Sequence, residues 1–185
     1  HRELPPCPTR RSSDLAVLAW LGYDPPDGVL TAAGGVSARR GAAGLATLLR
    51  ELAGRRPAAT ITLVGHSYGS LVVSLAAAEA PTQVTDVVSL GGVGAGVQRA
   101  DDLPGGRRFW AAEAPTDWIR RVPPVRLPGL GFGRRPGDPE FGARPLPVGG
   151  VAGHDGYLAP GSAALVAVAA VVLGGVDADR IGDAR

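Results

Sequence analysis

Short apolar runs alternate along this chain with longer segments whose apolar residues recur at helical spacing. The short runs lie at 16–21, 60–64, 84–90 and 108–114, and the helical patterns cover 37–53 and begin again near 68 and 162. Short apolar runs without polar alternation predict strands that are covered on both faces. Strands that alternate with helices predict a mostly parallel, doubly wound sheet, and therefore an α/β fold. Gly54 is placed to end the first helix.

The strand predicted at 60–64 leads directly into the sequence GHSYG, and a helix pattern follows at once. A strand, a sharp turn and a helix with Ser67 at the apex predict a nucleophile elbow, which lifts the serine hydroxyl above the carboxyl end of the sheet. We expect Gly65 and Gly69 to let strand and helix approach closely. The amide of Tyr68 should then point to the position of an oxyanion. The alternative is a serine in a glycine-rich loop.

The chain has three histidines, His1, His66 and His154. A serine nucleophile needs a neighbour that can take its proton near neutral pH, and histidine is the usual one. His66 directly precedes the serine, so we expect its side chain to point away from the substrate side. His1 lies in a segment unlike the rest of the chain. His154, just before the last predicted helix, is therefore the candidate base, although a lone histidine is more often a surface or core residue.

Several aspartates lie between the candidate nucleophile and the candidate base. The acid should follow a late strand, within reach of the histidine, where it fixes the tautomer of the imidazole. Asp117 follows the strand predicted at 108–114 and fits this position. Asp138 lies in a loop rich in proline and glycine, where a turn residue is the alternative. Asp101 and Asp102 also remain possible, but we predict Asp117, with Asp138 as its main rival.

These motifs, taken in order, resemble an actinobacterial α/β-hydrolase family long classed as a domain of unknown function. The resemblance covers residues 16 to about 175, and GHSYGS and WLGYD are its most specific parts; LGGVGAGV, RFWAAEAPTDWI and GHDGYL also contribute. It implies an α/β-hydrolase fold with Ser67 as nucleophile and His154 as base, and it favours Asp117 as acid. We therefore predict a serine hydrolase, esterase-like, that acts on an ester-like acyl substrate. The alternatives are an acyltransferase and a catalytically silent binding module.

Composition narrows the possible partners. The chain has 185 residues, 45% of them hydrophobic, and a net charge of +2. This charge is small and no basic stripe carries interleaved aromatics, which argues against nucleic acid. The apolar run at 163–176 is too short to span a membrane, and the glycine-rich turn after 84–90 lacks the spacing of a dinucleotide motif. We expect a small-molecule acyl substrate, and no metal, no cofactor, no nucleic acid and no transmembrane segment.

Residues 1–15 differ from the hydrolase domain that we predict at 16–185. They have no periodicity and contain the sole cysteine, Cys7. We interpret them as a non-native or disordered tail, with 8–15 resembling a translated adapter sequence. Because the chain contains no methionine, we expect it to be an amino-terminally truncated piece of a longer parent protein. A hydrolase of this fold takes a second oxyanion donor from an earlier strand, so we expect this piece to be impaired as an enzyme.

The segment 118–147, between the candidate acid and base, has little periodicity and is rich in proline, glycine and arginine. Long irregular insertions in compact domains are often lids or binding loops. Arg134 and Arg135 are the candidates for binding an anionic substrate, because guanidinium groups pair well with carboxylate and phosphate. The alternative is a solvated loop from an arginine-rich genome.

Overall fold

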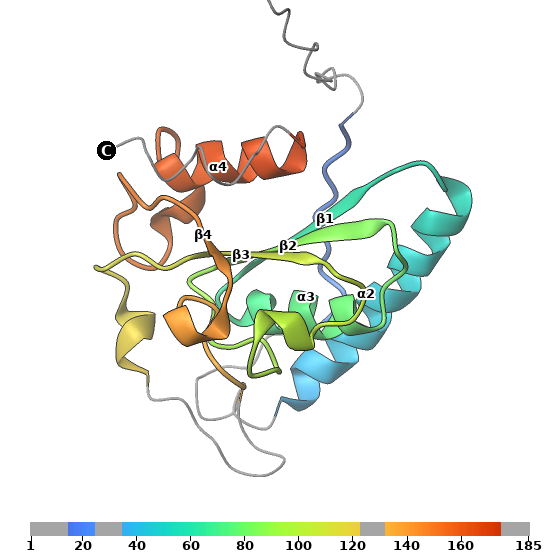
Figure 1. Cartoon of the computed structure of the whole chain (residues 1–185), viewed down its shortest axis with the longest axis horizontal. Helices are drawn as coiled ribbons and strands as arrows, with labels where there is room; N and C mark the ends of the chain where they lie inside the picture. The colour runs from blue at the N-terminus through green and yellow to red at the C-terminus, as the bar shows by residue number, and fades with distance from the viewer. Residues whose placement is uncertain (1–14, 25–34, 123–131, 175–185) are drawn as a thin grey trace, which may run out of the picture.

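The computed structural model describes residues 15–24, 35–122 and 132–174. The described residues form one parallel four-stranded sheet in the order β1-β2-β3-β4, with helices on both of its faces (Figure 1). The α/β fold predicted from the alternating pattern is therefore confirmed. The strands are β1 (Ile61–His66), β2 (Val84–Leu90), β3 (Arg108–Ala112) and β4 (Arg144–Pro145), and the helices are α2 (Val36–Arg55), α3 (Tyr68–Ala78) and α4 (Ala163–Val172).

Both faces of the central strands are covered. Successive residues of a strand point to opposite faces, so Val87 and Phe109 pack in the core layer that includes residues of α2 and α3. Val88 and Trp110, one position further on, pack in the layer that includes residues of α4. Figure 1 shows α2 and α3 on one side of the sheet and α4 on the other. This double coverage explains why the strands are continuous apolar runs in the sequence.

The helices begin and end close to their predicted bounds, with one correction. Gly54 does not end α2, because the helix continues to Arg55 and the amide of Arg56 still donates to the Leu52 carbonyl. At the other end of the chain, the Ser162 hydroxyl accepts from the Leu165 amide and starts α4. A serine in this role satisfies one of the free amides of the first helical turn.

The strand predicted at 16–21 does not form. Residues 15–24 contain no strand, and Val17 and Leu21 are 88% and 90% exposed. A strand needs a neighbour for its amides and carbonyls, and no described strand pairs with this segment. A cavity of about 700 Å³ lies between it and β1; the lining includes Leu15, Leu18, Trp20, Ile61, Leu63 and Val64. Among the described residues, the outer edge of β1 pairs with no strand.

The segment 118–147 contributes to the core in part. Two short 3-10 turns, η3 (Trp118–Arg121) and η4 (Pro139–Phe141), precede β4. Phe141 is fully buried and packs edge-on against Phe109, with ring centroids 5.0 Å apart. The Leu146 amide donates to the Ala111 carbonyl and continues the pairing of β4 with β3. Residues 123–131 of this segment and 1–14 of the predicted tail lie outside the described residues.

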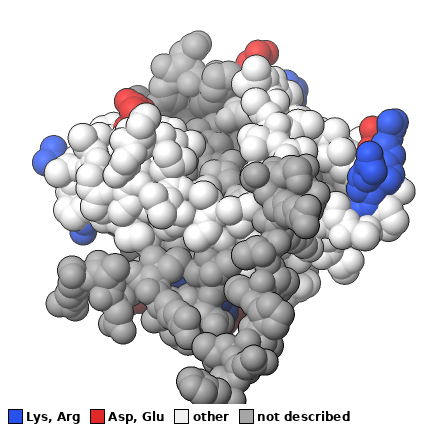
Figure 2. Space-filling view, turned by 90° about the horizontal axis from the view of Figure 1, so that it is seen from above, with Lys and Arg blue, Asp and Glu red and all other residues white. Residues whose placement is uncertain are grey.

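The surface seen from above is mostly uncharged where it is described, and its largest group of basic side chains lies at the right edge (Figure 2). None of the described helices has the length and apolar character needed to cross a membrane.

Candidate active site

Ser67 occupies the turn between β1 and α3 in a strained backbone conformation. Its φ of 53° and ψ of −122° make it the one non-glycine residue with positive φ among those described. Such a conformation costs roughly 1–3 kcal/mol. A Cβ at Gly65 would come within 2.6 Å of the Gly69 carbonyl oxygen, so the close approach of β1 and α3 requires glycine there. Gly69 was expected to serve the same purpose, but a Cβ there would meet nothing within 4 Å, so that expectation is wrong.

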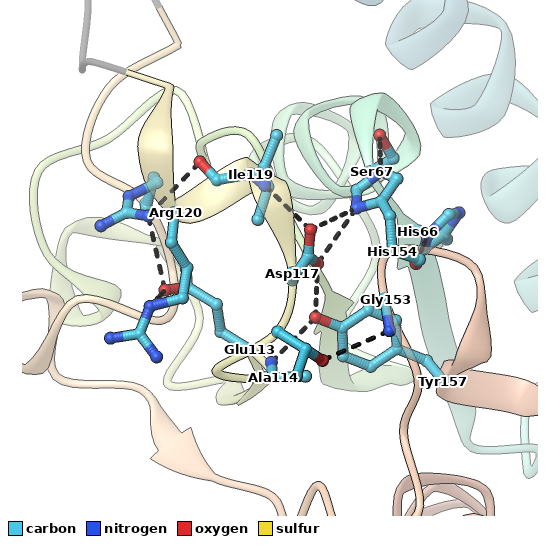
Figure 3. A network of polar contacts seen from close by, with 12 residues as sticks. His66, Ser67, Glu113, Ala114, Asp117, Ile119, Arg120, Gly153, His154 and Tyr157 are labelled. Atoms are coloured by element: carbon cyan, nitrogen blue, oxygen red, sulfur yellow. Dashed lines mark hydrogen bonds and ion pairs between the residues drawn. The ribbon is translucent and has the colours of Figure 1, made fainter.

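A hydrogen-bonded chain joins Ser67, His154 and Asp117 (Figure 3). His154 Nε2 lies 2.8 Å from Ser67 Oγ, and its Nδ1 lies 2.9 Å and 3.0 Å from the two carboxylate oxygens of Asp117. With Nδ1–H donating to the carboxylate, Nε2 is left to accept from the serine hydroxyl. The three residues come from the turn after β1, the loop between β4 and α4, and the turn after β3.

Asp117, rather than its rivals, contacts the histidine. Asp138 lies at the start of η4, where its carboxylate is 3.5 Å from Arg134. Asp102 is exposed on η2 (Ala100–Asp102). The structure therefore brings Asp117 to His154 and gives Asp138 the turn position that was its alternative interpretation.

The Asp117 carboxylate is buried and held by several donors. It accepts from the Tyr157 hydroxyl at 2.6 Å and from the Ile119 amide at 2.9 Å. Burial raises the pKa of this carboxyl, but the hydrogen bonds from Tyr157, Ile119 and His154 outweigh burial and hold the pKa below its usual value. Gly91, with φ 53°, makes room for the group, because a Cβ there would lie 2.7 Å from a carboxylate oxygen. The glycine-rich turn after β2 thus accommodates the acid.

Tyr157 is a contributor to the site that the sequence analysis missed. Its hydroxyl donates to Asp117 and accepts from the Ala114 amide at 2.9 Å, and the residue is only 1% exposed. Burial and the neighbouring carboxylate raise the pKa of the tyrosine. Its position three residues after His154 was visible in GHDGYL, but a tyrosine in such a context is usually a core residue.

His66, which the sequence did not favour as the base, packs against His154, the candidate base. Its Nε2–H donates to the backbone carbonyl of His154 at 2.7 Å, and the two rings lie 4.7 Å apart. The residue before the serine thus supports the loop that presents His154. Nothing in the local sequence signals this contact, because it joins positions 88 residues apart.

Tyr68 links the elbow to α2. Its amide is the first in α3, and the first amides of a helix have no acceptor within that helix. Its hydroxyl accepts from the Ala38 amide at 3.1 Å, which satisfies a free amide of α2 where the cap residue Gly35 offers no side chain. Its ring belongs to a row of aromatic side chains formed by Trp20, Tyr23, Tyr68 and Phe132.

The two arginines predicted to bind substrate are paired with carboxylates. Arg134 contacts Glu140 and lies 3.5 Å from Asp138, and Arg135 Nη1 lies 3.4 Å from Glu113. Glu113 is largely buried, and burial raises its pKa although Arg135 acts in the opposite direction. The Arg135–Glu113 contact ties the segment around η4 to the end of β3, whereas the contacts of Arg134 lie within that segment. Both pairings favour a structural role for these guanidinium groups.

Tyr157→Phe should lower kcat about tenfold with little change in KM, because phenylalanine keeps the ring but removes a donor to the Asp117 carboxylate. The folded pKa of Asp117 lies below its usual value, so its hydrogen bonds stabilise the fold at neutral pH and lose this effect as pH falls through the folded pKa. The variant should therefore lose about 1–2 kcal/mol at pH 7 and less in acid. Urea unfolding across this pH range and ester hydrolysis measure both effects. Lost stability with unchanged kcat would leave Tyr157 as a core residue only.

α/β-Hydrolases have a parallel sheet with a strained serine after one strand, a histidine hydrogen-bonded to that serine, and an aspartate hydrogen-bonded to the histidine, and this is the arrangement described above. Residues 8–127 match the family described as alpha/beta hydrolase. The chain belongs to this family, and membership supports hydrolase activity. The matched range includes Ser67 and Asp117 and ends before His154.

Curated relatives come from mycobacteria. Two uncharacterized proteins of Mycobacterium tuberculosis strains and one of Mycobacterium bovis are each 42% identical to this chain over 91 residues. The aligned region covers 48% of this chain and 34% of each relative. The chain therefore spans about a third of the length of the curated relatives it matches.

Proposed function

We propose that the parent protein is a serine hydrolase that cleaves an ester-like acyl substrate with Ser67, His154 and Asp117. The observation that carries this proposal is the continuous hydrogen-bonded chain from the Ser67 hydroxyl through the imidazole to a buried carboxylate. The strained backbone of Ser67 supports the proposal, because strain of this kind is concentrated at functional sites.

Acylation begins when Ser67 Oγ attacks the carbonyl carbon and His154 Nε2 takes the hydroxyl proton. Asp117 holds the imidazole in the required tautomer and stabilises its positive charge. The oxygen of the tetrahedral intermediate faces the Tyr68 amide, and one such donor is worth roughly 10²–10³ in kcat. The bond to the leaving oxygen then breaks, and His154 returns the proton to that oxygen.

Deacylation repeats the same steps with water. His154 takes a proton from a water molecule, whose oxygen attacks the acyl-Ser67 carbonyl. The bond to Ser67 Oγ breaks, the serine regains its proton from His154, and the carboxylic acid leaves. Each group thus returns to its starting state, and no cofactor is needed for the balance.

A fluorophosphonate probe should label the parent protein at Ser67, and Ser67→Ala should abolish labelling. Such probes react with a serine only when a neighbouring base activates it. Ser37→Ala, which removes a hydroxyl from α2, is the matched control and should label normally. Intact-mass spectrometry and peptide mapping give the readout. A folded parent that resists the probe would favour the catalytically silent binding module.

The acyltransferase alternative concerns the acceptor rather than the nucleophile. Hydrolysis in the presence of rising concentrations of a simple alcohol should still give the free acid as the main product. Accumulation of the new ester at the expense of the acid would instead identify acyl transfer. Product ratios measured by chromatography decide between the two.

Arg134→Ala and Arg135→Ala should change KM for anionic and neutral esters by similar factors, because both guanidinium groups already face carboxylates. Selection of anionic substrates would predict a larger rise in KM for the charged esters, and that difference would shrink as salt rises. Steady-state kinetics with a matched pair of charged and neutral esters, at low and high ionic strength, separates the two interpretations.

A further inference from the structure

Trp118 presents an exposed indole beside the imidazole of His154. Its side chain is 44% exposed, and the ring centroids lie 4.7 Å apart with an angle of 50° between the planes. Among the described residues, it is the one aromatic side chain in the set of exposed large hydrophobic groups. An exposed aromatic side chain is an apolar surface available for contact with a ligand. Its neighbour here is the base of the proposed reaction.

The position of Trp118 is fixed by the same turn that holds the acid. Trp118 begins η3 directly after Asp117, whose carboxylate caps the turn by accepting from the Ile119 amide. Ile119 is fully buried and anchors the turn in the protein interior. The Gly153 amide donates to Thr116 Oγ1 at 3.3 Å and joins this turn to the loop that carries the histidine. Figure 3 shows the Asp117–Ile119 turn facing the Gly153–His154 loop.

The direction of proton transfer assigns a side of the site to each half of the substrate. His154 Nε2 must reach the departing oxygen when the tetrahedral intermediate collapses, so the alcohol half of an ester lies beside the imidazole. The carbonyl oxygen faces the Tyr68 amide instead. Trp118 is the exposed aromatic side chain that borders this imidazole.

We propose that Trp118 forms a leaving-group subsite that favours flat, apolar alcohols, and aromatic alcohols above all. This inference rests on the proposed serine hydrolase function. Aromatic pairs gain energy beyond simple area burial, so an arylmethyl alcohol stacked on the indole binds better than methanol at the same place. Acyl-Ser67 no longer contains the alcohol, so the contribution of Trp118 belongs to acylation and not to deacylation.

The test compares benzyl butyrate with methyl butyrate in the parent protein and in Trp118→Ala. The two esters differ only in the alcohol, and kcat/KM covers the steps up to release of that alcohol, so the ratio of their kcat/KM values reports acylation. We expect Trp118→Ala to lower the ratio of benzyl to methyl kcat/KM about tenfold. Trp118→Phe, which keeps an aromatic ring, should restore most of the ratio. Val166→Ala, which trims a 66% exposed side chain on α4, should leave it unchanged.

A second substrate series excludes a general effect on the site. The ratio of methyl hexanoate to methyl acetate probes the acyl half, and Trp118→Ala should leave this ratio unchanged. A change in the acyl ratio with an unchanged benzyl ratio would place Trp118 on the other half of the substrate and overturn the inference. Equal losses for all esters, not rescued by Trp118→Phe, would show that Trp118 only supports the Asp117 turn and would also overturn it.

Different results would contradict the serine hydrolase function and the leaving-group subsite. A folded parent that neither reacts with a fluorophosphonate nor hydrolyses any ester contradicts the proposed function, and the leaving-group subsite falls with it. A parent that reacts at Ser67 and hydrolyses both butyrates, with the same benzyl preference in Trp118→Ala, retains the proposed function and rejects the subsite alone.

Discussion

Replacing Asp117 with asparagine should lower kcat of the parent protein by about 10⁴-fold. Asparagine keeps the shape of the side chain, but its amide can donate to the imidazole and stabilise the tautomer in which Nε2 carries the proton. That tautomer cannot accept from the Ser67 hydroxyl, so the nucleophile loses its base. Ester hydrolysis measures the loss of kcat, and thermal unfolding checks that the variant remains folded.

Asp138→Asn is the matched control for this experiment. Asp138 faces Arg134 at 3.5 Å and caps η4, so its replacement should change kcat by less than about twofold, as is usual for a surface position.

The low pKa of Asp117 keeps its carboxylate ionised through neutral pH. Activity should therefore not fall through protonation of Asp117 until pH drops below the usual value for an aspartate. A damaging Asp138→Asn beside a mild Asp117→Asn would reverse the assignment.

Residues 16–185 expressed by themselves should form dimers and larger species. The outer edge of β1 pairs with no described strand, and an unpaired edge promotes association. Size-exclusion chromatography over a range of protein concentrations measures this association.

A monomer at every concentration tested would contradict this expectation and show that the outer edge of β1 does not promote association.

The fold was predictable where the residues of a segment are sufficient to determine its structure. The run at 84–90 forms β2 without any shift, because both of its faces are buried and an apolar run needs no further information. The strand predicted at 16–21 does not form, because a strand depends on a pairing partner that its own residues do not specify. β4 was missed for a related reason, since two residues that include Pro145 carry no periodic signal.

The site divides in the same way. The elbow was visible because a strand, GHSYG and a helix adjoin in the sequence, and Asp117 followed from its place after β3. The roles of Tyr157, His66 and Trp118 depend on contacts between segments far apart in the chain, with 40 and 88 positions separating the first two from their partners. Aromatic residues and lone histidines are common in cores and on surfaces, so type alone could not single them out.

The positive φ of Ser67 makes serine less favourable than glycine at this position for the stability of the folded protein. Glycine adopts this backbone conformation without strain, so exchange of the serine for glycine should relieve part of the cost of the turn while it removes the reacting group. A lineage that abandoned catalysis would therefore be free to drift toward glycine at this position, and glycine there in a relative would mark a protein without a serine nucleophile.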